Sequence, residues 1–324
     1  MTVKPRAMRD VLLERIWQAM ADDPTLFFVS ADFGAPTLDK IRADYPTRFV
    51  NAGIAEQNLI NLCSGLALEG FKVFAYAIAP FITMRCYEQI RVNLALLSEV
   101  RPMNVTLIGV GAGYSYVVSG PTHQCYEDLT LMRALPNVSV YSPADHVTAE
   151  ALFDACVAEN GIKYLRFDAQ ILTPIYESAP QLSKGYHVHR QGEGLCLVAT
   201  GYMVHTALAA ADALANEGLQ VGVVDVMSLQ RPDLDGLCQY LASYPRVLSL
   251  EEGFQGRGGL DALLGEALRQ RQYAGVFEGR GVAPGYRFEL GSRNALHEQV
   301  GIGLQAVTDA ARDALKAVAA PVLV

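Results

Sequence analysis

Short apolar runs rich in β-branched and aromatic residues alternate along the chain with longer segments in which apolar residues recur at helical spacing. In the first half, the short runs are residues 26–29, 71–74, 104–108, 138–141 and 164–167. The longer segments between them are residues 9–20, 56–68, 81–97 and 146–158. This alternation predicts a parallel β-sheet covered by helices on both faces. Asp145 is expected to cap the last of these helices.

The pattern lapses in the middle of the chain and then resumes. Residues 168–192 are interrupted by Pro and Gly, which is typical of a linker. Beyond them, the expected strands are residues 195–199, 221–226 and 247–250, and the expected helices are residues 206–216, 234–241 and 259–269. The sequence therefore predicts the α/β fold class with two doubly wound domains, residues 1–178 and 179–324.

The composition narrows the possible partners. The 324 residues carry a net charge of -8 and have a pI near 5.3, and they contain no basic run. Nucleic acids and anionic membranes require clustered Lys and Arg, so we expect neither as a partner. The N-terminal residues lack the apolar core of a signal peptide, and no run of about 18 apolar residues could span a bilayer. These features predict a cytoplasmic protein.

The cysteines predict no metal or redox site in this chain. They stand singly within apolar segments, without the close pairs that zinc or redox chemistry uses. We therefore expect buried free thiols at Cys63, Cys86, Cys125, Cys156, Cys196 and Cys238.

The segment most suggestive of chemistry is Asn51-Ala52-Gly53-Ile54-Ala55-Glu56-Gln57-Asn58. It places Glu56 in the first turn of an otherwise apolar helix, where the helix dipole stabilises a carboxylate by a few tenths of a kcal/mol to about 1 kcal/mol. Taken alone, the segment also fits a first-turn glutamate with no further role. Two later segments favour a functional interpretation.

Aromatic and imidazole side chains follow at two points where α/β proteins gather their sites. Phe81 and Tyr87 open the predicted helix after Ala79-Pro80, near the carboxyl end of a strand. His123 lies in the turn Ser119-Gly120-Pro121-Thr122-His123-Gln124, where an imidazole is a candidate for proton transfer. Taken singly, the two aromatic residues fit a hydrophobic core and the histidine fits a structural role in the turn.

Together, Gly-Ile-Ala-Glu-Gln and Gly-Pro-Thr-His-Gln at this separation resemble the pyrimidine-binding domain of the transketolase family, which includes deoxyxylulose-phosphate synthase. The resemblance covers about residues 9–166 and continues more weakly through the second domain, which resembles the family's C-terminal domain. It implies a thiamine-diphosphate-dependent enzyme that transfers a two-carbon ketol unit between sugar-type substrates.

The resemblance also implies roles for individual residues. Glu56 matches the carboxylate that hydrogen-bonds the cofactor's aminopyrimidine ring and so promotes deprotonation of its reactive carbon. Phe81 matches the aromatic residue that stacks on that ring, Tyr87 matches a second aromatic residue of the same pocket, and Ile54 is expected in the same cofactor site. His123 matches the histidine that contacts hydroxyl groups derived from the substrate.

Three positions depart from the family pattern. Ser119 stands where an Asp helps to recognise the sugar, and Gly111 stands where a His is expected. The family's phosphate-binding Arg would fall near Ala169, so Arg166, Arg85 or Arg9 could replace it only by facing the cleft. These departures predict an unusual donor or acceptor, such as an activated or modified sugar. We retain Ser119, Arg166 and Arg85 as candidate substrate residues.

The resemblance further implies a second subunit. Family members hold Mg²⁺ and the cofactor's diphosphate through a Gly-Asp-Gly motif followed by Asn, and nothing in this sequence resembles that motif. We expect a separate N-terminal-type transketolase subunit to provide this site and to hold Mg²⁺. Since the family's cofactor lies between chains, the expected assembly is α2β2.

Alternative functions remain open at this stage. The β subunit of a 2-oxoacid dehydrogenase has a similar length and an equivalent glutamate, although His-Ser-Gln would be expected in place of Gly-Pro-Thr-His-Gln. A pyruvate-using acyloin or deoxyxylulose-phosphate-type synthase subunit is another possibility. A non-catalytic regulatory subunit could retain the fold without the chemistry, although the presence of Glu56, Phe81 and His123 together disfavours it.

Overall fold

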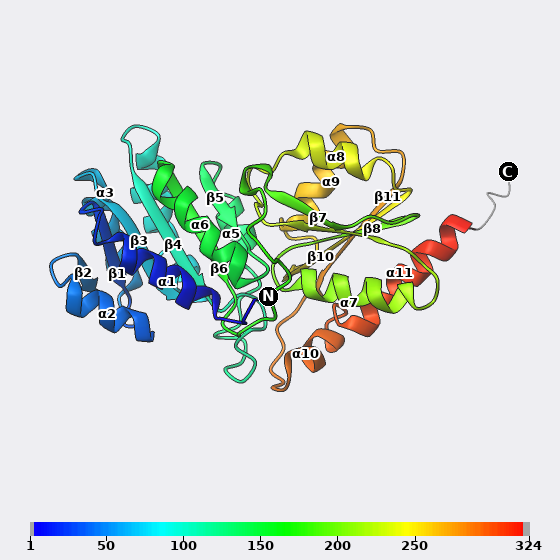
Figure 1. Cartoon of the computed structure of the whole chain (residues 1–324), viewed down its shortest axis with the longest axis horizontal. Coiled ribbons are helices and arrows are strands. Elements are labelled where there is room, and N and C mark those ends of the chain that lie inside the picture. The colour runs from blue at the N-terminus through cyan, green and yellow to red at the C-terminus, as the bar shows by residue number, and fades with distance from the viewer. Residues whose placement is uncertain (1–2, 320–324) are drawn as a thin grey trace.

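Two α/β units lie side by side in the computed structural model, which describes residues 3–319 (Figure 1). The first unit contains a six-stranded parallel sheet in the order β2-β1-β3-β4-β6-β5. Its strands are β1 (Leu26–Ser30), β2 (Phe49–Asn51), β3 (Lys72–Ile78), β4 (Asn104–Val110), β5 (Val138–Tyr141) and β6 (Gly161–Phe167). All side chains of β1 and β4 are buried, as expected for parallel strands covered on both faces.

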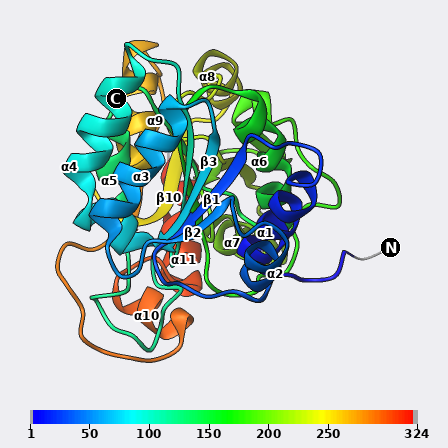
Figure 2. The same ribbon diagram turned by 90° about the vertical axis from the view of Figure 1, so that its left-hand side faces the viewer.

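Helices cover both faces of this sheet (Figure 2). One apolar cluster unites the strands with α1 (Met8–Ala19), α2 (Pro36–Asp44) and α6 (His146–Ala158). On the opposite face, another cluster includes α3 (Glu56–Leu68), α5 (Asp128–Arg133) and the helical segment after Pro80. The sheet is therefore the central layer of three.

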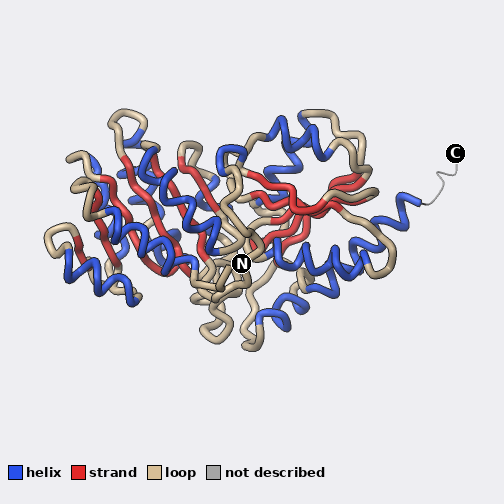
Figure 3. The backbone as a smooth tube through the Cα atoms, in the orientation of Figure 1, coloured by secondary structure: helices blue, strands red, loops and turns tan. Residues whose placement is uncertain are grey.

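The second unit repeats this three-layer plan around a five-stranded sheet in the order β11-β10-β8-β9-β7 (Figure 3). Its strands are β7 (Tyr186–Arg190), β8 (Leu195–Ala199), β9 (Gly222–Val226), β10 (Arg246–Phe254) and β11 (Val276–Val282). Four strands are parallel, and β7 is antiparallel to β9. One face carries α8 (Leu234–Leu241) and α9 (Leu260–Gln270), and the other carries α7 (Met203–Ala215), α10 (Arg293–Gln299) and α11 (Leu304–Ala319).

The two units are joined by backbone hydrogen bonds as well as by the chain itself. The N–H of Ser142, just after β5, donates to the carbonyl of Met227 at 2.9 Å, and the N–H of Leu229 donates to the carbonyl of Val140 at 2.8 Å. These bonds attach the edge of the first sheet to the segment after β9. They restrict movement of one unit against the other.

Much of the expected architecture is confirmed. The chain is α/β with two doubly wound units, and α3, α6 and α8 begin and end where the sequence predicts. Asp145 caps α6, because its side chain accepts a hydrogen bond from the N–H of Thr148 at 3.0 Å. All six cysteines are buried and free. Between residues 3 and 319, no helix is both long and apolar enough to cross a membrane.

Two expectations about local structure hold only in part. Residues 81–97 form two π-helical stretches, η1 (Phe81–Arg85) and η2 (Ile90–Leu96), around the short α4 (Tyr87–Gln89). Thr83 donates its hydroxyl to the carbonyl of Ala79 at 2.7 Å, a side-chain bond that competes with the regular helical ladder. The expected linker contains β7, whose side chains are only half-buried and give little hydrophobic signal.

Asp225 makes the stability of the second unit dependent on pH. Its carboxylate is buried in β9, where it accepts a hydrogen bond from the hydroxyl of Tyr176 at 2.8 Å. Burial raises the pKa of Asp225 to about 8, the Tyr176 bond opposes this, and the nearby charge of Asp145 adds to it. Since an unfolded Asp titrates near pH ~4, the folded state binds more protons between about pH 4 and 8. Stability is therefore lost as the pH rises through this window.

We predict that Asp225→Asn removes this pH dependence while keeping an acceptor for Tyr176. The free energy of unfolding of the unmodified chain should fall, relative to that of the variant, by up to roughly 1.4 kcal/mol per pH unit within the window. Urea unfolding at several pH values between 5 and 8 measures the difference. Parallel pH profiles for the two proteins would contradict the prediction.

Candidate active site

A buried glutamate stands at the amino end of α3, beside an open cavity. Glu56 is 5% exposed, and its Oε1 accepts a hydrogen bond from Nη1 of Arg85 at 3.0 Å. The cavity has a volume of about 500 Å³. It is lined by Ile54, Ala55, Glu56, Gln57, Asn58 and Arg85. A carboxylate that is nearly excluded from water thus faces a space large enough for a ring.

Arg85 connects this carboxylate to the aromatic residue predicted for the site. Its guanidinium carbon lies 3.8 Å from the centroid of the Phe81 ring, within the range of a cation–π contact. The amide of Gln57 donates to the carbonyl of Arg85 at 3.2 Å and holds the π-helical η1 against α3. The planar guanidinium of Arg85, which carries N–H donors, therefore lies over the Phe81 ring and is hydrogen-bonded to Glu56.

His123 completes this row of side chains. Its ring meets Phe81 edge-on with the centroids 5.2 Å apart, and its Nδ1 lies 2.9 Å from the hydroxyl of Thr122. Ser119 is exposed in the same loop. The structure thus brings Glu56, Phe81 and His123 into one neighbourhood from three segments of the chain.

In the loop before His123, the ring of Tyr116 packs against the backbone of Gly111. Gly111 has a φ of +113°, and a Cβ there would lie 2.3 Å from the ring of Tyr116. The Tyr116 ring in turn meets His123 edge-on with the centroids 6.4 Å apart. The space beside the position of the expected family histidine is therefore taken by a tyrosine that touches the His123 ring.

The remaining candidates for the cofactor site differ in their placement. Ile54 is 77% exposed and lines the cavity. Tyr87 is not among the lining residues, and its hydroxyl donates to the carbonyl of Leu131 in α5 at 2.9 Å. The position of Ile54 suits a contact with a bound ring, whereas the structure gives Tyr87 a packing role. A contact between Tyr87 and a cofactor stays a prediction.

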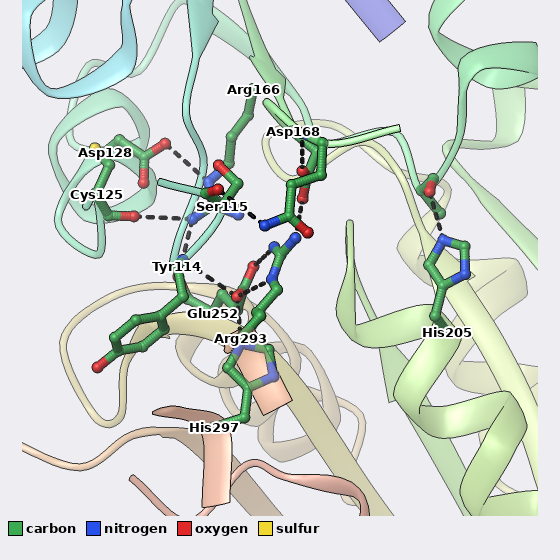
Figure 4. Close-up of polar contacts among 12 residues, drawn as sticks. Tyr114, Ser115, Cys125, Asp128, Arg166, Asp168, His205, Glu252, Arg293 and His297 are labelled. Carbon is green, nitrogen blue, oxygen red and sulfur yellow. Dashed lines mark hydrogen bonds and ion pairs between the residues drawn. The ribbon is translucent and has the colours of Figure 1, made fainter. Parts of the chain in front are cut away.

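The expectation that Arg166 could face the cleft is wrong. Its guanidinium is buried and donates from Nε to Asp128 at 2.8 Å and from Nη2 to the carbonyls of Cys125 and Glu252 (Figure 4). Asp128, which also accepts a hydrogen bond from the hydroxyl of Tyr164 at 2.8 Å, is fully buried. Because these partners occupy the fork, Arg166 supports the fold and offers no clamp to a phosphate.

Comparison with known proteins identifies the family. The model of the transketolase pyrimidine binding domain matches residues 4–174, and that of the transketolase C-terminal domain matches residues 185–307. The chain belongs to the transketolase family. The resemblance seen in the motifs is thereby confirmed for both parts of this transketolase-family chain.

Relatives of this transketolase-family chain include separate subunits. It is 29% identical over 306 residues to an apulose-4-phosphate transketolase subunit of Actinobacillus succinogenes, covering 94% of the chain and 97% of that protein. It is 27% identical over 263 residues to the 6-deoxy-6-sulfo-D-fructose transketolase subunit SqwH of a Clostridium species, covering 81% and 80%. A solved split gene transketolase, an inactive β4 tetramer, matches with a TM-score of 0.83 and 29% identity, covering 97% and 99%.

Sequence reasoning misses how Arg85 is used and which charged residues lie beneath the His123 loop. The sequence suggests Arg85 only as a contact for substrate phosphate, but its partners in this transketolase-family fold are Glu56 and Phe81. The sequence motifs described above assign Glu252 no chemistry. Glu252 lies within the chain, between the two units, where it is bonded to Arg293 and His297. The adjacent acids Glu251 and Glu252 after a strand are the available signal.

We predict that Arg166→Leu destabilises this transketolase-family protein by roughly 3–5 kcal/mol, because it leaves the buried Asp128 carboxylate without its charged partner. Urea unfolding measures the loss. Adding Asp128→Asn should restore part of it by removing the unpaired charge. Arg91→Leu, which removes an exposed arginine paired with Glu88, is the control and should leave the free energy of unfolding unchanged. An equally small effect of Arg166→Leu would contradict the structural role.

Proposed function

We propose that this chain is the pyrimidine-binding subunit of a thiamine-diphosphate-dependent, transketolase-like enzyme that transfers a two-carbon ketol unit between sugar-type substrates. The proposal depends on one observation. The buried Glu56 carboxylate and the Phe81 ring both contact the planar guanidinium of Arg85, which donates an N–H to Glu56. An aminopyrimidine ring has the same chemistry, since it is flat, presents N–H donors and stacks on aromatic rings. The residues present therefore fit this cofactor.

Each residue of the site has a defined task in this proposal. Thiamine diphosphate, when bound, supplies the nucleophilic carbon and the electron sink of the reaction. Glu56 would hold the ring and share a proton with its nitrogen, while Phe81 and Ile54 would pack against its apolar surface. His123 would donate to or accept from the substrate's hydroxyl groups. Ser119, exposed in the same loop, leaves room for a donor or acceptor other than a standard pentose phosphate.

We further propose that Mg²⁺ and the cofactor's diphosphate are held by a separate subunit in an α2β2 assembly. The names of the relatives support a separate subunit, because two of them are named as transketolase subunits and one solved structure is of a split gene transketolase. Among residues 3–319, no group of three or more His, Cys, Asp or Glu side chains is placed to hold a metal ion.

The exposed side of α3 has the composition of a contact surface for that subunit. Glu56 is the one charged residue of α3, and the exposed side chains that follow it are uncharged. Leu62 of α3 is exposed, as are Met84, Val92 and Leu96 of the adjacent helical segment. On α3, depletion of charge together with exposed apolar side chains is typical of the central part of protein interfaces, whereas the adjacent segment also exposes Arg85, Glu88 and Arg91. This surface begins at Ile54, on the rim of the Glu56 cavity, so one partner could cover both.

Other activities of the family make different predictions for the same site. A 2-oxoacid dehydrogenase β subunit or a pyruvate-using synthase would release CO₂ from a 2-oxoacid, whereas ketol transfer releases none. Product analysis of the chain mixed with a diphosphate-binding partner, supplied with a ketose or with pyruvate, separates these reactions. A non-catalytic regulatory subunit would give neither product and would not require Glu56.

We predict that Glu56→Gln leaves assembly with the partner intact and lowers cofactor-dependent turnover by at least ~10²-fold, because the amide cannot share a proton with the ring. Turnover and calorimetric titration of thiamine diphosphate with Mg²⁺ measure the two effects. In the unmodified protein, binding should occur in the mixture and not with this chain alone. Unchanged turnover in the variant would contradict the role assigned to Glu56 at the cofactor ring.

We predict that Leu62→Arg weakens binding of the partner by at least ~10-fold, because it buries an unpaired charge in the contact. Analytical ultracentrifugation of the mixed subunits measures the affinity. The matched control is Val276→Arg, which changes an exposed aliphatic side chain on β11 of the other unit and should leave assembly unchanged. Equal affinities for the two variants would rule out the proposed surface on α3.

A further inference from the structure

The loop that carries His123 is closed at its base by the chain's own backbone. The N–H of Gly113 donates to the carbonyl of Cys125 at 2.9 Å, and the N–H of Cys125 donates back to the carbonyl of Gly113 at 3.0 Å. Residues 114–124 therefore form a loop whose two ends are hydrogen-bonded to each other at Gly113 and Cys125. The base of the loop is buried, whereas Val118 near its tip is 74% exposed.

A carboxylate from the second unit supports this base. Oε1 of Glu252, at the end of β10, accepts a hydrogen bond from the N–H of Tyr114 at 3.2 Å. A Cβ on Gly113 would lie 2.4 Å from the carboxylate carbon of Glu252, so the carboxylate packs directly on a backbone that only glycine provides. The loop thus rests on a side chain that is 138 positions away in the sequence.

Glu252 is itself fixed by two buried donors from α10. Arg293 donates from Nε to Oε1 at 3.0 Å and from Nη2 to Oε2 at 2.5 Å, and Nε2 of His297 lies 2.5 Å from Oε1. Burial alone would raise the pKa of Glu252, but the charge of Arg293 and the hydrogen bonds with His297 and Arg293 hold it well below its usual range. The carboxylate therefore stays ionised and keeps its orientation.

The contacts continue from Arg293 back to the loop (Figure 4). Nη1 of Arg293 donates to Oδ2 of Asp168 at 2.6 Å, and Oδ1 of Asp168 accepts the N–H of Gln170 at 2.7 Å. The amide of Gln170 then donates to the carbonyl of Ser115 at 3.0 Å. Two consecutive loop residues, Tyr114 and Ser115, are thus held by side chains from both domains. We call this closed set of contacts the circuit; it consists of Tyr114, Glu252, Arg293, Asp168, Gln170 and Ser115.

We propose that Glu252 and Arg293 are positioning residues that set the placement of His123 from the second domain. This inference rests on the function proposed above, because it concerns the histidine assigned to the substrate. Buried charges that satisfy one another have few alternative arrangements, so the loop base has one position relative to β10 and α10. The tip, which presents His123 to Phe81, inherits that position.

The first test is hydrogen exchange of the chain carrying Glu252→Gln. Amides of residues 113–126 should exchange at least ~10-fold faster than in the unmodified chain, while those of β4 and β8 should not change. Gln170→Ala provides the same readout without disturbing a buried charge, should the first variant fail to fold. The matched control is Glu251→Gln, a neighbouring buried glutamate that bonds the N–H of Asp261 in α9 and lies outside the circuit. Unchanged exchange in residues 113–126, or equal acceleration throughout the chain, would overturn the anchoring role.

The second test is a double-mutant cycle with the partner subunit present. Glu252→Gln and His123→Asn should each lower kcat/KM for a ketose donor by at least ~10-fold, and the double variant should be no worse than His123→Asn alone. Calorimetric affinity for thiamine diphosphate with Mg²⁺ should stay within about twofold, because the Glu56 cavity lies apart from the circuit. Additive losses would show that Glu252 does not act through His123. If instead the unmodified mixture binds no cofactor, the proposed function fails, while the exchange experiment still decides the anchoring.

Discussion

The structure depends on charged side chains that are buried between the two domains. Arg166 with Asp128, and Arg293 with Glu252 and Asp168, are each almost fully excluded from water. An ionised group in such a place is tolerated only while its partner is present, and removal of one member leaves an uncompensated charge. The domains therefore cannot separate without exposing or orphaning several charges at once.

The candidate site residues come from distant segments of the chain. Glu56 belongs to the start of α3, Phe81 to the π-helical η1 after β3, and His123 to a long loop after β4. The helix dipole and burial serve the glutamate locally, and the irregular helix brings Phe81 and Arg85 to it. The loop closes on its own backbone at Gly113 and Cys125, and Gln170 of the first unit bonds the carbonyl of Ser115. Glu252 of the second domain adds a hydrogen bond from the N–H of Tyr114, so that domain supports the loop although it supplies none of the candidate site residues.

The sequence predicted the layers and most helices and strands, because these depend on periodicity. Its short motifs singled out Glu56, Phe81 and His123, which the structure brings into one neighbourhood. It failed where the outcome depends on contacts between distant segments. The sequence offered Arg166 as a candidate contact for substrate. Its partners are instead Asp128, 38 positions before it, and the carbonyl of Glu252, 86 positions after it. The break in residues 81–97 also left no trace in the apolar pattern, because π turns still bury one side of the segment. Short or half-exposed strands such as β7 carry too weak an alternation to be recognised.

The antiparallel strand β7 has a mechanical consequence. The segment that links the domains leads directly into β7, which pairs with β9 and so forms one edge of the second sheet. Within this segment, the N–H groups of Ile175 and Tyr176 donate to Oδ2 of Asp145 in the first unit at 2.9 and 3.0 Å. The connection between the domains is therefore bonded to the first unit near its middle and to the second sheet at its end. Extending it would require these bonds to break, so the connecting segment itself adds to the resistance against separating the two domains.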